Sequence, residues 1–262
     1  MTFQHFQNTT LKEKAMLSKS QSIRAPHPAL RNLPPTFLPP VQDHAQPVEE
    51  LLPFTVRLVA DEKGLQKAAT IRHSAYARHL PEFAETLRHP EPADREKGVA
   101  VLLAESKVDK APLGTMRIHS NGNQALPLER SLDLPDWLKN NRRAEATRLA
   151  VSRDREGQLV KTILFKAYFQ YCQAQGVEWL VIAGRSPVDR QYDRLLFSDV
   201  FPDMGYIPLR HAGNVPHRVM CFNVDLAEKL WKSAKHPLYE FVCKTYHPDI
   251  NLSHESKGWE IH

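Results

Sequence analysis

A carboxylate and a guanidinium lie on one otherwise apolar stretch of this chain. The stretch Arg143-Ala-Glu-Ala-Thr-Arg-Leu-Ala-Val151 has the composition of a buried strand and carries Glu145 and Arg148. Burying charge is costly unless the charge is paired or used. Residues three apart in a regular strand face opposite sides of the sheet, so either each has its own task or a bulge re-aims one of them. Because bulges often lie beside active sites, this strand is the strongest functional lead.

The segments before this strand predict the elements that hold it in place. Residues 54–59 alternate as a strand, and Asp61 is suited to cap a helix that continues to about Leu80. A short helix is expected over residues 82–88. Residues 99–105 and 112–119 form two strands joined by a short polar linker, which predicts a hairpin.

The segments after this strand predict a crossover. A helix from about Gln158 has an apolar face at helical spacing and ends at Gly176. The fully apolar strand 179–183 then suits parallel pairing through a helical connection. A helix over 188–197, strands near 206–210 and 217–224, and a helix over 225–244 follow. This order predicts an α/β or α+β fold with a mixed central sheet flanked by helices.

The 262 residues favour one domain with a tail. Residues 1–53 contain eight prolines and read as a flexible arm, or as a segment that docks on the domain or a partner. Residues 54–224 form the predicted domain, and residues 225–262 a C-terminal helix and tail. No apolar run is long enough for a membrane span and no secretory signal is visible, so a cytoplasmic protein is expected.

The net charge of +5 suits an anionic partner such as an acidic carrier protein or a phosphate-bearing cofactor, or is simply a solvated surface. No recognition motif accompanies the charge, so nucleic-acid binding is not expected. The three cysteines lack metal-ligand spacing, and no metal site is predicted; Cys172 and Cys221 fall on apolar faces and suit the core.

Four motifs, in order, resemble the GNAT acyltransferase fold, and within it the FeeM-like N-acyl amino acid synthases and the LuxI-type acyl-homoserine-lactone synthases. The resemblance covers roughly residues 54–224. The motifs are Ile71-Arg-His-Ser-Ala-Tyr76, Asp94 before the second strand, Gly114-Thr-Met-Arg-Ile118 with its continuation Leu126-Pro-Leu-Glu-Arg130, and the strand Glu145 to Val151.

Two departures from the wider pattern favour the N-acyl amino acid synthases. The turn before the long helix, residues 153–157, has one glycine where enzymes that use acyl-coenzyme A usually have a glycine-rich turn. The tryptophan that homoserine-lactone synthases carry after the first helix is missing, since His79-Leu-Pro-Glu-Phe83 occupies that region. An acyl-homoserine-lactone synthase using S-adenosylmethionine remains an alternative. A non-catalytic module that binds acyl groups or a carrier protein is another.

The resemblance implies transfer of a long-chain fatty acyl group from acyl carrier protein to the amine of an amino acid. The donor thioester would be on phosphopantetheine, with acyl-coenzyme A also possible, and no bound cofactor is expected. Glu145 is the candidate base, directly or through water, because a carboxylate in a dry cleft can be tuned toward neutrality. Its alternative role is a structural ion pair with Arg148 or Arg117.

Further residues receive roles by the same resemblance. Arg72, Arg117 and Arg148 can hold the carboxylate of the acceptor bidentately, or instead order a loop through Asp94. Tyr76 lies one helical turn from Arg72 and is expected to bind substrate with it. The expected oxyanion donors are backbone N–H groups around Leu149–Ser152, and Leu149 and Val151 are counted among the substrate-binding residues. Tyr192 resembles the tyrosine that protonates the leaving thiol, or packs in the core. Arg153, Arg155 and Lys161 are expected to bind the pantetheine phosphate. Together with Lys139, Arg142 and Arg143 they could also contact an acidic carrier protein. The alternative is that these basic residues form only a solvated loop.

Overall fold

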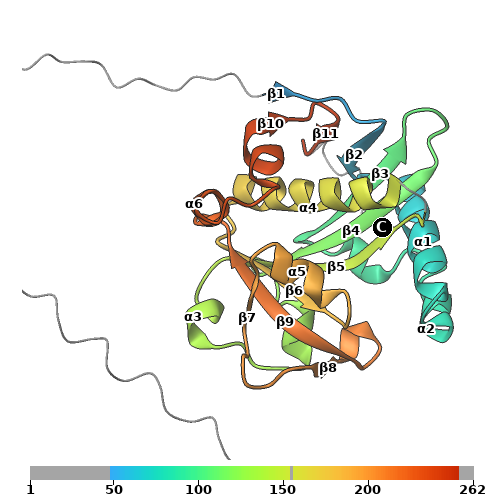
Figure 1. Cartoon of the computed structure of the whole chain (residues 1–262). Coiled ribbons are helices and arrows are strands. Elements are labelled where there is room, and N and C mark those ends of the chain that lie inside the picture. Colours follow the sequence, from blue (N-terminus) through green and yellow to red (C-terminus); the bar gives the residue numbers. More distant parts are fainter. Residues whose placement is uncertain (1–47, 154–155, 254–262) are drawn as a thin grey trace, which may run out of the picture. The chain divides into compact units, whose positions relative to one another are not determined.

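The computed structural model describes residues 48–153 and 156–253. A mixed sheet of nine strands is the frame on which the helices are placed (Figure 1). Its strands lie in the order β11-β2-β3-β4-β5-β6-β9-β7, and β8 pairs with the free part of β9. The strand bounds are β2 Phe54–Leu58, β3 Val99–Ser106, β4 Pro112–Ser120, β5 Arg143–Val151, β6 Trp179–Gly184, β7 Ser198–Asp199, β8 Ile207–Leu209, β9 Val215–Asn223 and β11 Ile250–Asn251.

Alternate residues of β3 face different helices. Val101 and Leu103 pack with Leu65 of α1 (Glu62–Ala77), whereas Leu102 packs with Leu164 of α4 (Glu156–Ala174). This alternation is the two-residue period of a strand. The sheet therefore has an α1 face and an α4 face. The remaining helices are α2 Pro81–Glu85, α3 Asp136–Lys139, α5 Asp189–Arg194 and α6 Ala227–Ser233, with short 3₁₀ turns η1 Pro92–Arg95, η2 Pro127–Arg130 and η3 Arg210–Ala212.

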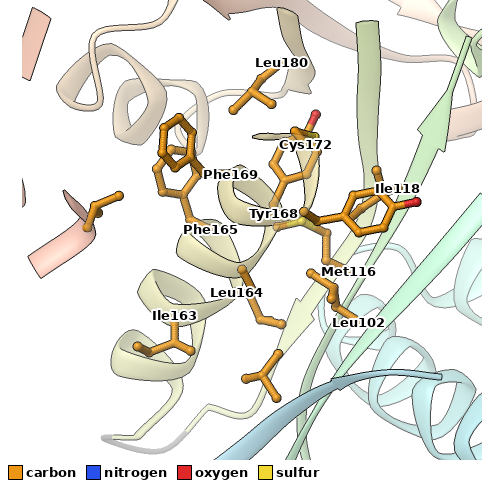
Figure 2. Packing of buried hydrophobic residues seen from close by; sticks show 14 of the residues in the cluster. Leu102, Met116, Ile118, Ile163, Leu164, Phe165, Tyr168, Phe169, Cys172 and Leu180 are labelled. Atoms are coloured by element: carbon orange, nitrogen blue, oxygen red, sulfur yellow. The ribbon is translucent and has the colours of Figure 1, made fainter. Parts of the chain in front are cut away.

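The largest apolar cluster lies between α4 and the sheet (Figure 2). Ile163, Leu164 and Tyr168 of α4 meet Met116 and Ile118 of β4 there. The hydroxyl of Tyr168 is satisfied within this apolar layer because it donates a hydrogen bond to the carbonyl of Ala144 at 2.7 Å. The predicted helix and its apolar face are confirmed, and so is the burial of Cys172 and Cys221.

The parallel pair β5 and β6, joined through α4, confirms the predicted crossover. Their pairing runs from Arg143 opposite Trp179 to Ala146 opposite Ile182 and goes no further. Strand β5 nevertheless continues to Val151. The two strands therefore separate over the second half of β5, and none of the described strands pairs there with the edge of β5 that faces β6.

A bulge in β5 explains how both charged residues of the strand can serve one site. Arg117 is opposite Thr147 and Thr115 is opposite Ala150, so two residues of β5 face Met116. Arg148 lies at this bulge with φ 54°, in the left-handed region that a side chain of its size rarely adopts. The bulge turns Arg148 toward the α1 face, which it shares with Glu145, and the bulge interpretation of the sequence is confirmed.

The single helix predicted over residues 225–244 is wrong. Helix α6 ends at Ser233, Pro237 interrupts the segment, and a π-helical turn η4 occupies Glu240–Lys244. Proline cannot donate the backbone hydrogen bond that a continuous helix needs. The chain then forms a separate two-stranded sheet, in which β10 (Thr245–Tyr246) pairs with β1 (Val48–Glu49), and returns to the main sheet as β11 beside β2.

Smaller corrections concern the edges of the molecule. Helix α5 ends at Arg194 and is shorter than the predicted 188–197, because Leu196 has φ 68°, outside the right-handed helical region. Residues 1–47 of the predicted arm lie outside the described residues, whereas Leu52 is buried in the domain. None of the described helices has the length and apolarity that crossing a lipid bilayer requires.

Candidate active site

A polar strip runs along the α1 face over β4 and β5. Arg117 and His119 of β4 are register partners of Thr147 and Glu145 of β5, and register partners point to the same face. All four are buried. Apolar clusters flank the strip, one beneath α1 and one formed by η2, α3 and strands β6 and β9. Buried polar residues between two apolar clusters are the pattern of a functional site.

Glu145 is fully buried, and its two oxygens have different neighbours. Oε2 accepts a hydrogen bond from the backbone N–H of Leu128 at 2.9 Å. Oε1 lies 3.1 Å from Nε2 of His211, which is within ion-pair distance, but the angle is not that of a hydrogen bond. Among the described residues Glu145 is paired with neither Arg148 nor Arg117, so the structural ion pair considered from the sequence is not formed.

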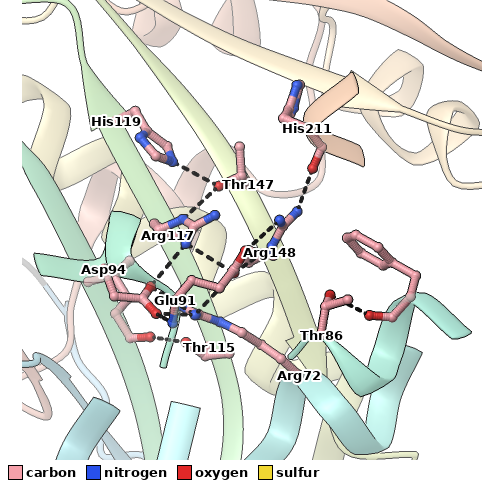
Figure 3. Close-up of polar contacts among 12 residues, drawn as sticks. Arg72, Thr86, Glu91, Asp94, Thr115, Arg117, His119, Thr147, Arg148 and His211 are labelled. Carbon is pink, nitrogen blue, oxygen red and sulfur yellow. Dashed lines mark hydrogen bonds and ion pairs between the residues drawn. The ribbon is translucent and has the colours of Figure 1, made fainter. Parts of the chain in front are cut away.

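The three predicted arginines are brought together by two carboxylates (Figure 3). Asp94 accepts from Nη1 of Arg72 with both oxygens at 2.8 Å, and from Nη1 of Arg117 at 3.2 Å. The second carboxylate is Glu91, which accepts from Arg117 at 3.1 Å and from Arg148 through Nε and Nη2 at 2.8 Å each. Three guanidinium groups against two carboxylates leave this network with a formal charge of +1.

Glu91 was not recognised from the sequence. Its backbone N–H donates to Asp94 at 2.8 Å, so the two acidic residues are fixed to each other across the first turn of η1. Burial raises the pKa of Glu91, but the hydrogen bond from Arg148 and the nearby charge of Arg117 outweigh it and hold the pKa at about 2. The available signal was an acidic residue three positions before Asp94, ahead of the proline in the same turn.

Histidines complete the strip, and sequence reasoning missed them because they lie far apart along the chain. Nε2 of His119 lies 3.2 Å from the hydroxyl of Thr147, and burial, followed by the charge of Arg117, lowers the pKa of His119 to about 3. Nδ1 of His217 donates to the carbonyl of Val215 at 2.6 Å, and burial lowers its pKa as well. Within residues 48–153 and 156–253, no group of acidic, histidine or cysteine side chains could hold a metal ion.

An aromatic wall stands beside Arg148. Its guanidinium lies over the ring of Phe83, 5.1 Å from the ring centroid, and the rings of Tyr76 and Phe83 are 5.7 Å apart. Tyr76 is also near Tyr192, which belongs to the other face of the sheet. Burial raises the pKa of Tyr192 to about 12, and the nearby Tyr76 adds to this increase. The predicted Tyr76 therefore lies between the polar strip and the residues around Tyr192.

A cavity of about 490 Å³ lies on the α4 face, between β5, β6, α4 and α5. Its walls are mostly apolar and include Ala146, Leu149 and Ile182 from the two separating strands. Tyr192 also lines it, and Val151 packs against the adjoining core. Of the backbone donors expected near Leu149, the N–H of Ser152 is already used, since it donates to the carbonyl of Leu113 at 2.8 Å.

The predicted basic residues do not form one surface. Lys161 lines the cavity, where its Nζ donates to Gln191 at 2.6 Å and burial lowers its pKa. Arg153 is exposed, and Arg155 lies outside the described residues. Arg142 donates to the carbonyl of Gln175, just past the last residue of α4 and roughly 28 Å from its first turn at 1.5 Å per residue.

Arg143 is likewise not part of a carrier-binding surface. Its side chain is buried and its Nη2 donates to Glu129 at 2.8 Å. With its side chain 7% exposed, Arg143 has little surface to offer a partner, so its assignment to the carrier protein is wrong. Arg142 is exposed, and its part in carrier binding stays a prediction.

The mixed sheet and the crossover between two strands that separate beside an apolar cavity define a GNAT-type acyltransferase fold. The match to known families narrows this class. A family model described as N-acyl amino acid synthase FeeM matches residues 67–219, and the chain belongs to this family. It is an acyltransferase.

Comparison with solved structures agrees with the fold. The structure of FeeM, an N-acyl amino acid synthase from uncultured soil microbes, has a TM-score of 0.53 and 16% sequence identity, and covers 72% of this chain and 96% of that chain. A coenzyme A-dependent acyl-homoserine lactone synthase, BjaI, solved with SAM and isopentyl-CoA, has a TM-score of 0.49 and 17% identity, over 74% of this chain and 93% of that one. No protein with a curated description matches the chain significantly.

Proposed function

We propose that this protein transfers a long-chain fatty acyl group from the phosphopantetheine thioester of acyl carrier protein to the amine of an amino acid. The observation that carries this proposal is the placement of two unlike sites on opposite faces of β5. A charged strip containing Glu145 lies on the α1 face, and an apolar cavity bounded by Leu149 lies on the α4 face. Arg148 of the strip and Leu149 of the cavity wall are consecutive residues in the half of β5 that lies beyond its pairing with β6.

The polar strip is suited to the acceptor. The network of Arg72, Arg117 and Arg148 has an excess positive charge, which favours the carboxylate of an amino acid. Asp94 and Glu91 hold the three guanidinium groups in fixed positions, so these groups lose little entropy on binding. Glu145 supplies the negative charge that favours removal of a proton from the amine.

The cavity and the free edge of β5 are suited to the donor. Its apolar walls favour an acyl chain, at about 0.8 kcal/mol for each buried methylene group. The unpaired backbone beyond Ala146 can hydrogen-bond an extended pantetheine arm as an added strand would. Lys161 and the exposed Arg153 near the start of α4 are the candidates for its phosphate, aided by the helix dipole.

The reaction requires two proton transfers, one from the acceptor and one to the leaving group. The acceptor ammonium first loses a proton, and the neutral amine then attacks the thioester carbonyl, so that a C–N bond forms and the C–S bond breaks. The leaving thiolate takes up a proton, for which the hydroxyl of Tyr192 in the cavity wall is the candidate donor. Backbone N–H groups near Leu149 are the candidates that stabilise the oxyanion.

The test supplies purified protein with dodecanoyl-acyl carrier protein and each of the twenty amino acids, and detects acyl amides by mass spectrometry. Dodecanoyl-coenzyme A is the second donor, and S-adenosylmethionine is an additional acceptor. An N-acyl amino acid formed faster from the carrier protein supports the proposal. An acyl-homoserine lactone from S-adenosylmethionine would replace it with the autoinducer reaction, and no product with either donor would leave an acyl-binding module.

A further inference from the structure

His211 contacts both charged residues of β5. Nε2 of its imidazole lies 3.1 Å from Oε1 of Glu145. Its backbone carbonyl accepts a hydrogen bond from Nη1 of Arg148 at 3.1 Å (Figure 3). It comes from η3, a turn 66 positions after Glu145 in the sequence, so no local motif connects the two. One residue of this turn is therefore held between the candidate base and the candidate carboxylate-binding arginine.

We propose that His211, and not Glu145, takes the proton from the acceptor amine, and that Glu145 orients the imidazole and stabilises its protonated form. This inference rests on the proposed function. A general base must come within hydrogen-bonding distance of the proton it removes. Glu145 is fully buried with Oε2 on the N–H of Leu128 and Oε1 against His211, whereas the side chain of His211 is 11% exposed, with its Nδ1 buried just beneath the accessible part of the ring.

The atoms of His211 are disposed for this task. Its Nε2 faces the carboxylate, and its Nδ1 has no hydrogen-bond partner among the described residues. A buried polar nitrogen without a partner is uncommon and needs an explanation. A carboxylate on one imidazole nitrogen, with the other nitrogen left for the reacting group, is the arrangement that converts histidine into an efficient base.

The two neighbouring histidines are less suited to the task. His119 is buried with its Nε2 beside the hydroxyl of Thr147, and the same burial that lowers its pKa to about 3 makes it a poor proton acceptor near neutral pH. His217 already uses Nδ1 to donate to the carbonyl of Val215. His211 is the histidine of the strip that also approaches Glu145.

Turn η3 holds His211 firmly enough for such a role. The N–H of Arg210 donates to the hydroxyl of Ser131 at 2.9 Å, which ties the start of the turn to η2. Gly213 ends the turn with φ 71°, and a Cβ added there would lie 3.6 Å from the ring of Phe83. The turn is thus fixed between the η2 segment and the aromatic wall beside Arg148.

In the proposed step the acceptor ammonium transfers one proton to Nδ1 of His211. This produces the neutral amine and an imidazolium paired with the carboxylate of Glu145. After the C–N bond has formed and the C–S bond has broken, one proton from the nitrogen is lost and the thiolate becomes a thiol. The overall balance is one ammonium and one thioester giving one amide, one thiol and one released proton.

The test compares His211→Asn, Glu145→Gln and the double variant with a matched control, His73→Asn. His73 belongs to a histidine–glutamate pair on the surface, with Nε2 3.3 Å from Oε1 of Glu85. With dodecanoyl-acyl carrier protein and the acceptor found for the wild-type protein, we expect kcat to fall by about 10²- to 10⁴-fold in His211→Asn and to be unchanged in His73→Asn. Thermal unfolding and acyl-probe binding verify that each variant is folded.

Two readouts separate a base from a structural residue. In the wild-type protein kcat/KM should rise with pH and then level off once the base is unprotonated. In His211→Asn, kcat/KM should instead rise about tenfold per pH unit up to the pKa of the acceptor amine, because only the amine that is already neutral can react. Added imidazole should restore part of the lost rate in His211→Asn and none in Glu145→Gln. The titratable and charged groups near the imidazole of His211 are Glu145, Arg148, His119 and His217.

The double variant completes the cycle. If the two residues act as a unit, it should be no slower than the slower single variant. An active wild-type protein whose His211→Asn variant keeps its rate within twofold and its pH profile would overturn the inference, and a multiplicative loss in the double variant would do the same. An inactive wild-type protein with every donor and acceptor would instead reject the proposed function itself.

Discussion

Arg148 and Glu91 form a bidentate ion pair in which Nε and Nη2 each lie 2.8 Å from a different carboxylate oxygen. The pair depends on the bulge of β5, since a regular strand would direct Arg148 to the α4 face and into the apolar core. Glu91 also meets Arg117, so its carboxylate joins two strands and one turn. The strained backbone at Arg148 is thus compensated by the ion pairs that it permits.

We predict an acid sensitivity that depends on Glu91. Its pKa is about 2 in the folded protein, below the 4.5 of an unperturbed glutamate. Its contribution to the free energy of unfolding is therefore fully present above pH 4.5 and is lost as the pH falls toward 2. Between pH 6 and pH 3 this contribution should fall by about 2 kcal/mol, at roughly 1.4 kcal/mol per pKa unit. Urea unfolding at both pH values should show a smaller decrease for Glu91→Gln than for the wild-type protein.

Glu82→Gln is the control for this measurement, because Glu82 lies at an exposed position in the first turn of α2. It should show the wild-type decrease in unfolding free energy. An equal decrease in Glu91→Gln and the wild-type protein would contradict the prediction.

Gly114 determines how closely α4 can approach β4. A Cβ at this position would lie 2.5 Å from Cγ1 of Val160, so Gly114→Ala forces the helix away from the sheet. We expect the free energy of unfolding to fall by about 1–3 kcal/mol, the usual cost of overpacking a core. Gly122→Ala is the control, since an added Cβ there has no neighbour within 4 Å. Denaturant unfolding of the two variants should differ by at least 1 kcal/mol if the prediction holds.

The elements with strong local periodicity were predictable from the sequence. The apolar spacing of α4 and the uninterrupted apolar run of β6 identified the crossover, and with it the parallel pair that positions the site. The arginines could be grouped because each lies in a motif of the family resemblance, and Asp94 was recognised as the residue through which they could order a loop. Local sequence patterns and family motifs were sufficient to predict an element when the contacts that form it are between residues close in sequence, or when the whole fold family shares them.

The remaining features depend on contacts between distant segments. The meeting of His211 with Glu145 depends on the placement of η3 against β5, and no pattern near either residue signals it. Arg143 looked like a surface charge because its partner, Glu129, lies in a different element. The apolar residues around Pro237 suggested one helix, whereas the segment serves to wall the cavity and return to the sheet.

Lys166 should be needed to hold residues 240–253, the segment that follows α6 and returns to the sheet. Its side chain is buried in α4, and Nζ donates to the carbonyls of Phe241 and Thr245 at 2.7 and 2.6 Å. Lys166→Met keeps the apolar stem but leaves both carbonyls without this donor, which should cost about 2–4 kcal/mol. Limited proteolysis should cut the variant within residues 240–253 faster than the wild-type protein, whereas Lys229→Met, at an exposed position of α6, should not change the rate. Equal cleavage rates in both variants would show that other contacts hold the segment.

The cavity beneath α4 gives a direct test of where the acyl chain binds. Thr162 lines the cavity, and Leu159, one turn earlier on the same helix, is 37% exposed. Thr162→Phe places a ring in the space available to the chain. If the ring displaces two methylene groups at about 0.8 kcal/mol each, binding should weaken by roughly 15-fold. Leu159→Phe adds the same ring at the surface and should bind like the wild-type protein.

The measurement is titration of each variant with a dodecanoyl thioester and with its acetyl counterpart, followed by intrinsic tryptophan fluorescence or calorimetry. Thr162→Phe should lose affinity for the dodecanoyl compound and keep its weak affinity for the acetyl compound, because the short chain does not reach the occupied volume. If Thr162→Phe and Leu159→Phe bind the dodecanoyl compound equally, the chain lies elsewhere. In that case the space between β5 and β6 would hold only the pantetheine arm, and not the acyl chain.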